Sequence, residues 1–350
     1  MNPKPAVSLA DIAADPQWTP HRLDMQRRVV SFARFNRDAL ARASFLDYRI
    51  DDAANGWAEI SVDSLLADDI GLETNRRPAF LFHTSYCCST LLTRALDKPG
   101  VVLALREPDI IMGLSNAYRM AASRSAIEET DKLRDVLLAL IARPHHGDER
   151  VLIKPTNAAN NLAPLFARLG ISMILLYGDL RGFLASVIKK GDPSKTIIRQ
   201  IYRVFAMDEA GVSVIPQRDA LALTDLQIAA LVWRHQIEMF NEMLTAPGAD
   251  NIRSLDFRRF LENPADTLLA ASEHLAFAYN GEQCRAIAGS DLFRRDAKDV
   301  SVDYSARQRN DEETALMAQN ADALNLIENW AFNLSLWPAK TRRLPRPLLD

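Results

Sequence analysis

Short apolar runs alternate with amphipathic segments between residues 77 and 257. Each apolar run is nearly continuous, which is typical of a strand buried on both faces, and the segments between the runs have a helical period. Strands that alternate with helices in this way predict an α/β fold with a central parallel sheet. We expect strands at 77–85, 100–108, 150–156, 171–179 and 251–257, and helices at 89–97, 109–122, 125–144, 160–170 and 181–191.

The ends of the chain have a different pattern. In residues 17–48, apolar positions such as Val29, Phe32 and Leu40 recur among arginines with a spacing that we interpret as helical. We therefore expect residues 1–76 to form an N-terminal helical extension on the core, and residues 77–350 to form the α/β domain. Further helices are predicted at 194–211, 224–247, 264–277 and 311–335, with a long polar and basic loop at 292–310.

Polar residues follow the predicted strands at one edge of the sheet. Parallel sheets bind ligands at the carboxyl ends of their strands. Residues 83–89, 107–109, 154–157 and 178–181 are therefore expected along one rim.

The turn at 83–89 joins the first predicted strand to a helix. A strand, a tight turn and a helix leave backbone N–H groups pointing at one place, which suits an anion, and Ser85, Ser89 and Thr90 add hydroxyl groups. The alternative is a serine-capped helix after a buried strand. The GxxxxGK[ST] pattern is absent, which argues against nucleotide hydrolysis of that kind.

The cysteines and the histidine of this region suggest no metal site. A metal ion needs more ligands than Cys87, Cys88 and His83 provide, so we interpret the cysteines as small residues in a tight space. We expect His83 to be a hydrogen-bonded core histidine, and His235, on a helix, to be structural.

The composition fits an ordinary soluble protein. Hydrophobic residues make up 48% of the chain and charged residues 25%, and the net charge of −3 argues weakly against a nucleic-acid-binding surface. No apolar window is long enough for a membrane span, and the N-terminus lacks the pattern of a signal peptide. Three cysteines do not suggest a disulfide framework, so we expect a cytoplasmic protein.

The order of these segments resembles the bacterial branch of the sulfotransferase superfamily. The resemblance covers roughly residues 77–310, and it rests on the order and spacing of motifs that are each degenerate. They are HTSYCCSTLL at 83–92, LREPD at 105–109, LIKPTNAANNLAPLFARLG at 152–170, YGDLRGFLAS at 177–186, WRHQIEMFNEML at 233–244 and the strand–helix segment that starts IRSLDF at 252.

The resemblance implies a three-layer P-loop-like fold and a transfer reaction. Such enzymes move a sulfonate from 3′-phosphoadenosine 5′-phosphosulfate to a hydroxyl or amine, here of a small-molecule acceptor, and no metal is predicted. The implied donor-binding residues are Thr84, Ser85, Tyr86, Cys87, Cys88, Ser89 and Thr90 for the 5′-phosphosulfate, Arg181 and Ser186 for the 3′-phosphate, and Lys298 in the long loop. Glu107 is the implied base, with Asp109 as an alternative whose simpler role is a helix N-cap, and Lys154 supplies positive charge.

Three positions depart from the family pattern. Tyr86 stands where the family has a lysine or arginine, Cys88 replaces the glycine of the turn, and Gly178 replaces the first arginine for the 3′-phosphate. Two other functions therefore stay open. One is a relative that binds a nucleotide or a protein without catalysis. The other is a nucleotide-dependent P-loop-type transferase or kinase, for which Asp179 is the candidate metal carboxylate.

Overall fold

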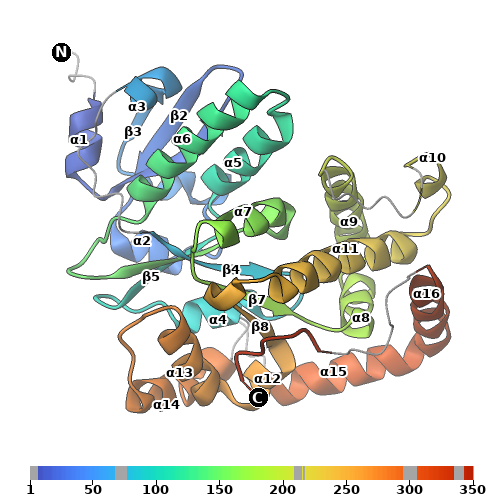
Figure 1. Cartoon of the computed structure of the whole chain (residues 1–350). Helices are drawn as coiled ribbons and strands as arrows, with labels where there is room; N and C mark the ends of the chain where they lie inside the picture. The colour runs from blue at the N-terminus through green and yellow to red at the C-terminus, as the bar shows by residue number, and fades with distance from the viewer. Residues whose placement is uncertain are drawn as a thin grey trace. The chain divides into compact units, whose positions relative to one another are not determined.

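The computed structural model describes residues 7–67, 77–208, 215, 217–294, 306–334 and 343–349. A five-stranded sheet with the order β5-β6-β4-β7-β8 is central to it (Figure 1). The pairs β4–β6, β5–β6 and β7–β8 are parallel. The strands are β4 (Ala79–His83), β5 (Val102–Arg106), β6 (Arg150–Lys154), β7 (Met173–Tyr177) and β8 (Ile252–Asp256). The predicted α/β class and the central parallel sheet are confirmed.

The strands form where the apolar runs predict them. Every residue of β4, β5 and β7 is buried, as expected for strands covered on both faces. By the density of its internal contacts the chain divides into two compact units. Unit 1 is Met1–Leu81 with Thr93–Leu162, and unit 2 is Phe82–Leu92 with Ala163–Asp350. The expected boundary at residue 76 falls at the segment 68–76, which lies outside the described residues.

Unit 1 contains an antiparallel sheet, so the helical prediction for residues 17–48 was wrong over 18–34, while residues 37–42 of the same segment are helical. The sheet has the order β1-β2-β3, with β1 (Trp18–Asp24), β2 (Val29–Arg34) and β3 (Trp57–Ser61). In β2, Val30 and Phe32 are buried while Val29 and Ser31 are half-buried, which is the period of two that a strand requires. A short apolar run fits both periods, and here strand pairing decided between them.

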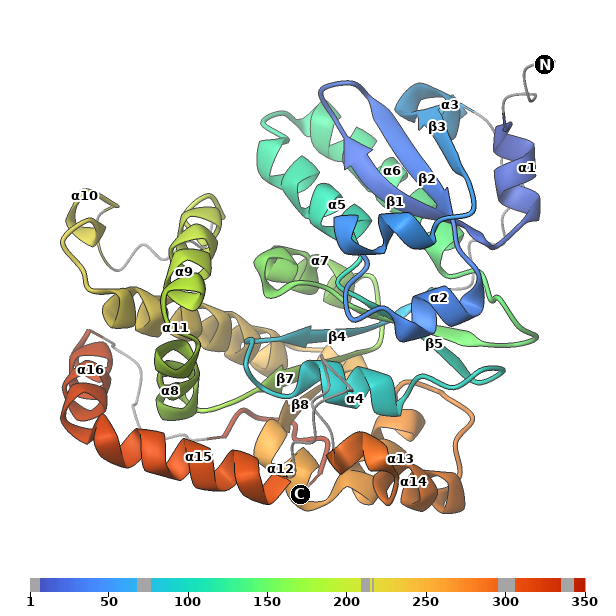
Figure 2. The same ribbon diagram turned by 180° about the vertical axis from the view of Figure 1, so that it is seen from behind.

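The helices of unit 1 cover one face of this antiparallel sheet. Figures 1 and 2 show α5 and α6 against the sheet in both views, and the two helices contact β1. Both were predicted. The elements are α1 (Leu9–Ala14), α2 (Arg37–Arg42), η1 (Tyr48–Ala53), α3 (Val62–Ala67), α5 (Asp109–Met120), α6 (Arg124–Ile141) and η2 (Asn157–Leu162). A further helix, α4 (Ser89–Ala95), follows the turn after β4.

A buried cluster of ion pairs fixes α2 inside unit 1. The side chain of Arg106 is fully buried, and its Nη2 donates to the carbonyl oxygens of Leu40 and Ala41, each at 2.7 Å, near the end of α2. Asp97 accepts from Arg106 at 2.9 Å and also pairs with Arg37. Arginine satisfies the last carbonyls of the helix in this way, and its charge is compensated by the carboxylate.

Unit 2 is mostly helical. The helix α11 (Asp225–Thr245) contacts α8, α9 and α16, and it begins with a capping box between Thr224 and Gln227. The predicted C-terminal helical additions are confirmed. The other elements are α7 (Ala163–Arg168), α8 (Leu180–Lys190), α9 (Asp192–Phe205), α10 (Gln217–Ala220), η3 (Ala249–Asn251), α12 (Phe257–Glu262), α13 (Pro264–His274), α14 (Gly281–Ala288), η4 (Asp291–Arg294), α15 (Ala306–Gln319) and α16 (Ala321–Asn333).

The position of the end of the chain was not predicted, and the expected loop at 292–310 differs from the prediction at both of its ends. The end of the chain lies beside β8, where the Ser254 amide donates to the Arg346 carbonyl at 2.9 Å and the Leu348 amide donates to the Ser254 carbonyl at 2.7 Å. The expected loop at 292–310 includes the end of η4 and the start of α15, and residues 295–305 lie outside the described residues. No helix in the described part of the chain is long and apolar enough to cross a bilayer.

Candidate functional site

The turn after β4 adopts a backbone that glycine normally provides. Ser85, Tyr86 and Cys88 have φ angles of +71°, +53° and +58°. Residues with a side chain rarely occupy this region because the Cβ atom crowds the backbone. Turns with left-handed residues form concave nests of backbone N–H groups, which bind anions. The turn therefore keeps the curled shape of an anion-binding loop without glycine.

Contacts within unit 2 hold this turn in place. The Thr84 amide donates to the Leu176 carbonyl of β7 at 3.1 Å, and Cys87 Sγ lies 3.7 Å from the same oxygen. The Ser85 amide donates to His83 Nδ1 at 3.0 Å, which supports the reading of His83 as a hydrogen-bonded core histidine. Cys87 is buried and Cys88 is half-buried. Thr84, Ser89 and Thr90 are buried as well.

Tyr86 points from the turn onto α8 and α9. Its ring lies edge-on to Phe183 with 5.3 Å between the centroids, and its hydroxyl hydrogen-bonds with the Ser194 hydroxyl. Burial raises the pKa of Tyr86, so the side chain is a neutral phenol at neutral pH. The Lys190 ammonium lies over the ring, 5.8 Å from its centroid. Sequence reasoning missed Lys190, because no motif singles out this position.

The helix α8 carries the two residues expected at the 3′-phosphate. Arg181 donates to Glu328 Oε2 at 2.6 Å and to Asn325 Oδ1 at 2.9 Å, so α16 holds its guanidinium. Ser186 is half-buried in the middle of α8. Phe183, Ser186 and Lys190 follow one another at helical spacing, which places them on one face of the helix.

Gly178 stands where the sulfotransferase family has an arginine, and it packs against Phe257. A Cβ atom at this position would lie 2.9 Å from Cε1 of Phe257. The Gly178 carbonyl accepts a hydrogen bond from the Trp233 indole at 2.8 Å, so the backbone is held as well. The ring of Phe257 fills the space that a side chain at 178 needs, which accounts for the glycine.

Glu107 and Lys154 form an ion pair in unit 1. Lys154 Nζ lies 2.5 Å from Glu107 Oε1, and the Glu107 amide donates to the Lys154 carbonyl at 2.6 Å. The Lys154 side chain is fully buried, while that of Glu107 is 23% exposed. Glu107 has a φ angle of +52°. The structure thus brings the two predicted catalytic residues together, and the turn at 84–90 belongs to unit 2.

The remaining candidate residues have structural contacts or lie outside the described residues. Pro108 is the N-cap of α5 and Asp109 is its first residue, so the expected N-cap role of Asp109 was wrong. The Asp109 amide donates instead to the Leu46 carbonyl at 3.1 Å. Burial raises the pKa of Asp109. Asp179 caps α8 by accepting from the Gly182 amide at 2.7 Å, and it pairs with Arg258. Lys298 lies outside the described residues.

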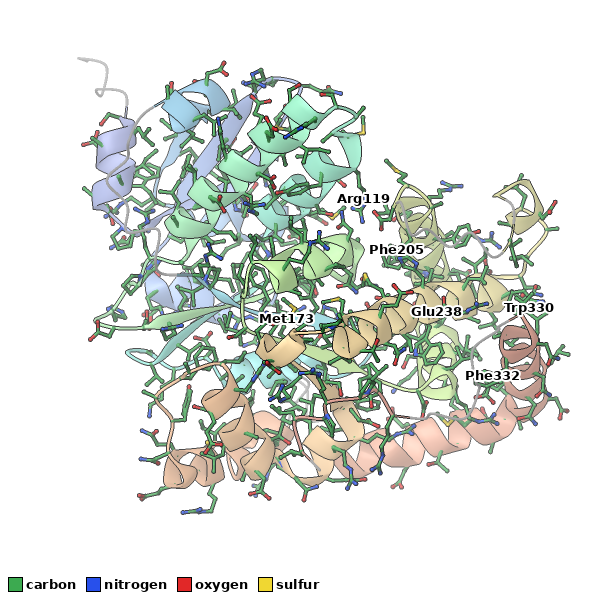
Figure 3. All side chains as sticks on the ribbon, in the orientation of Figure 1. Arg119, Met173, Phe205, Glu238, Trp330 and Phe332 are labelled. Carbon is green, nitrogen blue, oxygen red and sulfur yellow. The ribbon has the colours of Figure 1, made fainter. Side chains whose placement is uncertain are left out.

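The histidine on α11 packs as a structural residue. His235 on α11 is buried, with its ring centroid 4.6 Å from that of Phe205, which Figure 3 labels on α9. It packs between helices, as expected for a structural residue. Within the described ranges, no group of three or more histidine, cysteine, aspartate and glutamate side chains is arranged to hold a metal ion.

Comparison with known proteins gives weak likenesses only. No protein-family model matches the chain, and no curated protein matches it. The solved structure of mouse sulfotransferase SULT7A1 complexed with PAP is 11% identical, with a TM-score of 0.32, over 79% of this chain and 96% of that one. A sulfotransferase domain from the curacin biosynthetic pathway is also 11% identical, with a TM-score of 0.33, over 77% of this chain and 95% of that one. Both structures are named as sulfotransferases.

Proposed function

We propose that the chain is a sulfotransferase that moves a sulfonate from 3′-phosphoadenosine 5′-phosphosulfate to a hydroxyl or amine of a small molecule. The observation that carries the proposal is the backbone of the turn, where Ser85, Tyr86 and Cys88 are all left-handed. Each such residue costs about 1–2 kcal/mol. Strain of this kind persists where a particular shape is needed, and this shape suits an anion.

In this proposal the donor is bound by backbone and hydroxyl groups of the turn, other than the Thr84 and Ser85 amides, which donate to Leu176 and His83. We assign residues 84–90 to the 5′-phosphosulfate and Ser186 to the 3′-phosphate, as the motif order implies. Arg181 is paired with Glu328 through Nη1, so a contact with the 3′-phosphate would come from its other guanidinium nitrogens. Lys298 keeps its proposed role on sequence grounds alone.

For the chemical step we assign Glu107 as the base and Lys154 as the cation. The acceptor oxygen or nitrogen forms the new bond to sulfur while the bond between sulfur and the bridging phosphate oxygen breaks. The bisphosphate leaves with that oxygen, and the carboxylate of Glu107 accepts the proton of the acceptor. Its exposed fraction of 23% leaves the carboxylate accessible to an acceptor, while the buried Lys154 holds it in one position. A fixed positive charge stabilises developing negative charge better than a mobile one.

The first test is calorimetric titration with adenosine 3′,5′-bisphosphate, with ATP as the control ligand. The proposal expects micromolar binding of the bisphosphate and much weaker binding of ATP. Turnover of the phosphosulfate with a panel of phenols, alcohols and amines then tests catalysis. Glu107→Gln is expected to bind the bisphosphate like the wild type but to lose turnover. A wild-type protein that does not bind the bisphosphate contradicts the proposal.

A second candidate function is binding without catalysis. The observation that favours it is the loss of two cationic positions: Gly178 lies under the ring of Phe257, and Arg181 is held by Glu328. The two functions differ in one measurement. A wild-type protein that binds the bisphosphate but shows no turnover with any acceptor is a binding protein.

A further inference from the structure

The ring of Tyr86 contacts α8 at two points that are seven residues apart. The first is Phe183, with 5.3 Å between the ring centroids, and the second is Lys190, whose Nζ lies 5.8 Å from the Tyr86 centroid. Seven residues are close to two helical turns, so both contacts lie on one face of α8. Ser186 belongs to the same face, because it is three residues from Phe183 and four from Lys190. The turn, the serine and the lysine are therefore neighbours within unit 2.

Tyr86 positions the ammonium of Lys190. The face of an aromatic ring attracts a cation, and this attraction keeps the charge beside the turn. The hydrogen bond between the Tyr86 hydroxyl and Ser194 on α9 holds the aromatic ring in position. The adjacent Lys189 has a different partner, since its ammonium pairs with Glu312 of α15 at 2.5 Å. Two consecutive lysines thus have different surroundings.

The two positions expected to supply a cation for the donor's 3′-phosphate are both constrained. A side chain at 178 would meet the ring of Phe257, and the guanidinium of Arg181 is paired with Glu328. Lys190 has its charge on the face of α8 that carries Ser186. We propose that Lys190, held by the Tyr86 ring, binds the 3′-phosphate together with Ser186. This inference rests on the proposed function.

The test compares two ligands that differ only in the 3′-phosphate. Adenosine 3′,5′-bisphosphate and adenosine 5′-monophosphate are titrated into the wild type, Lys190→Gln, Lys190→Arg and Lys189→Gln. Lys190→Gln is expected to weaken the bisphosphate about tenfold to a hundredfold, the range of a charged hydrogen bond, and to leave the monophosphate within about twofold. Lys190→Arg restores most of the affinity. Lys189→Gln, the matched control, changes neither ligand.

The outcomes separate this inference from the proposed function. If the wild type does not bind the bisphosphate, the proposed function fails and the inference with it. If the wild type binds it and Lys190→Gln binds it equally well, only the inference is wrong. An equal loss for both ligands also overturns the inference, because the charge then does not act on the 3′-phosphate. Thermal unfolding of each variant confirms that the protein tested is folded.

Discussion

The ammonium of Lys154 lies 2.5 Å from the carboxylate of Glu107, and the lysine side chain is fully buried. Removing one member of such a pair leaves the other charge without its compensation, which is more costly than replacing both. This relationship makes the pair a structural element of unit 1 as well as a candidate for chemistry.

We expect Lys154→Met to lower the free energy of unfolding by about 2–4 kcal/mol, since it leaves the Glu107 carboxylate partly buried without its cation. The double variant Glu107→Gln with Lys154→Met is expected to be more stable than Lys154→Met alone. Urea denaturation of the wild type, both single variants and the double variant measures the coupling. Additive effects of the two substitutions would show that the pair contributes no coupling energy.

Gly178→Ala is expected to destabilise the protein by about 1–3 kcal/mol through overpacking, because the new Cβ lies 2.9 Å from the Phe257 ring. Gly289→Ala is the control, since a Cβ there meets only ordinary contacts, the nearest at 3.5 Å. Thermal unfolding of both variants checks the prediction. The double variant Gly178→Ala with Phe257→Leu is expected to regain part of the stability that Gly178→Ala loses. Equal melting temperatures for the wild type and Gly178→Ala would contradict the packing argument.

The turn predicts opposite effects for two substitutions of Cys88. Its φ angle of +58° is unstrained for glycine and poor for a β-branched residue. Cys88→Gly is expected to leave the stability unchanged or to raise it by up to about 1 kcal/mol, while Cys88→Val lowers it by at least about 1 kcal/mol. Melting temperatures measure both. A valine variant as stable as the glycine variant rules out the strained turn.

We predict that the protein loses stability in acid because of His145. Burial lowers its pKa to about 4, against about 6.5 in the unfolded chain. Between these values the unfolded state binds more protons, so the stability is fully present above pH 6.5 and falls by about 2–3 kcal/mol as the pH drops towards 4. His145→Gln removes this contribution. Unfolding at pH 7.5, 6.0 and 5.0 is expected to show a flatter pH dependence for His145→Gln than for the wild type.

The exposed neighbour His146 provides the control for this experiment. His146→Gln is expected to keep the pH dependence of the wild type. If both variants behave alike, the acid sensitivity arises elsewhere in the protein.

The sequence by itself determined the central sheet. Runs such as 79–82 and 173–177 are apolar throughout, and only a strand covered on both faces, or a buried helix, accommodates such a run. The runs are too short for buried helices, and helical segments separate them, so we predict strands. The same reasoning failed at 29–34, where a six-residue run fits either period and the antiparallel partners decided the outcome.

The tertiary structure alone decided the surroundings of the candidate residues. Arg181 meets Glu328, which is 147 residues away in the chain, and Gly178 lies under Phe257. Lys190 reaches Tyr86 across more than a hundred residues. Local periodicity and motif spacing report which element a residue joins, because they depend on the chain's own geometry. Contacts between distant elements depend on how helices and strands pack, and no local pattern encodes them.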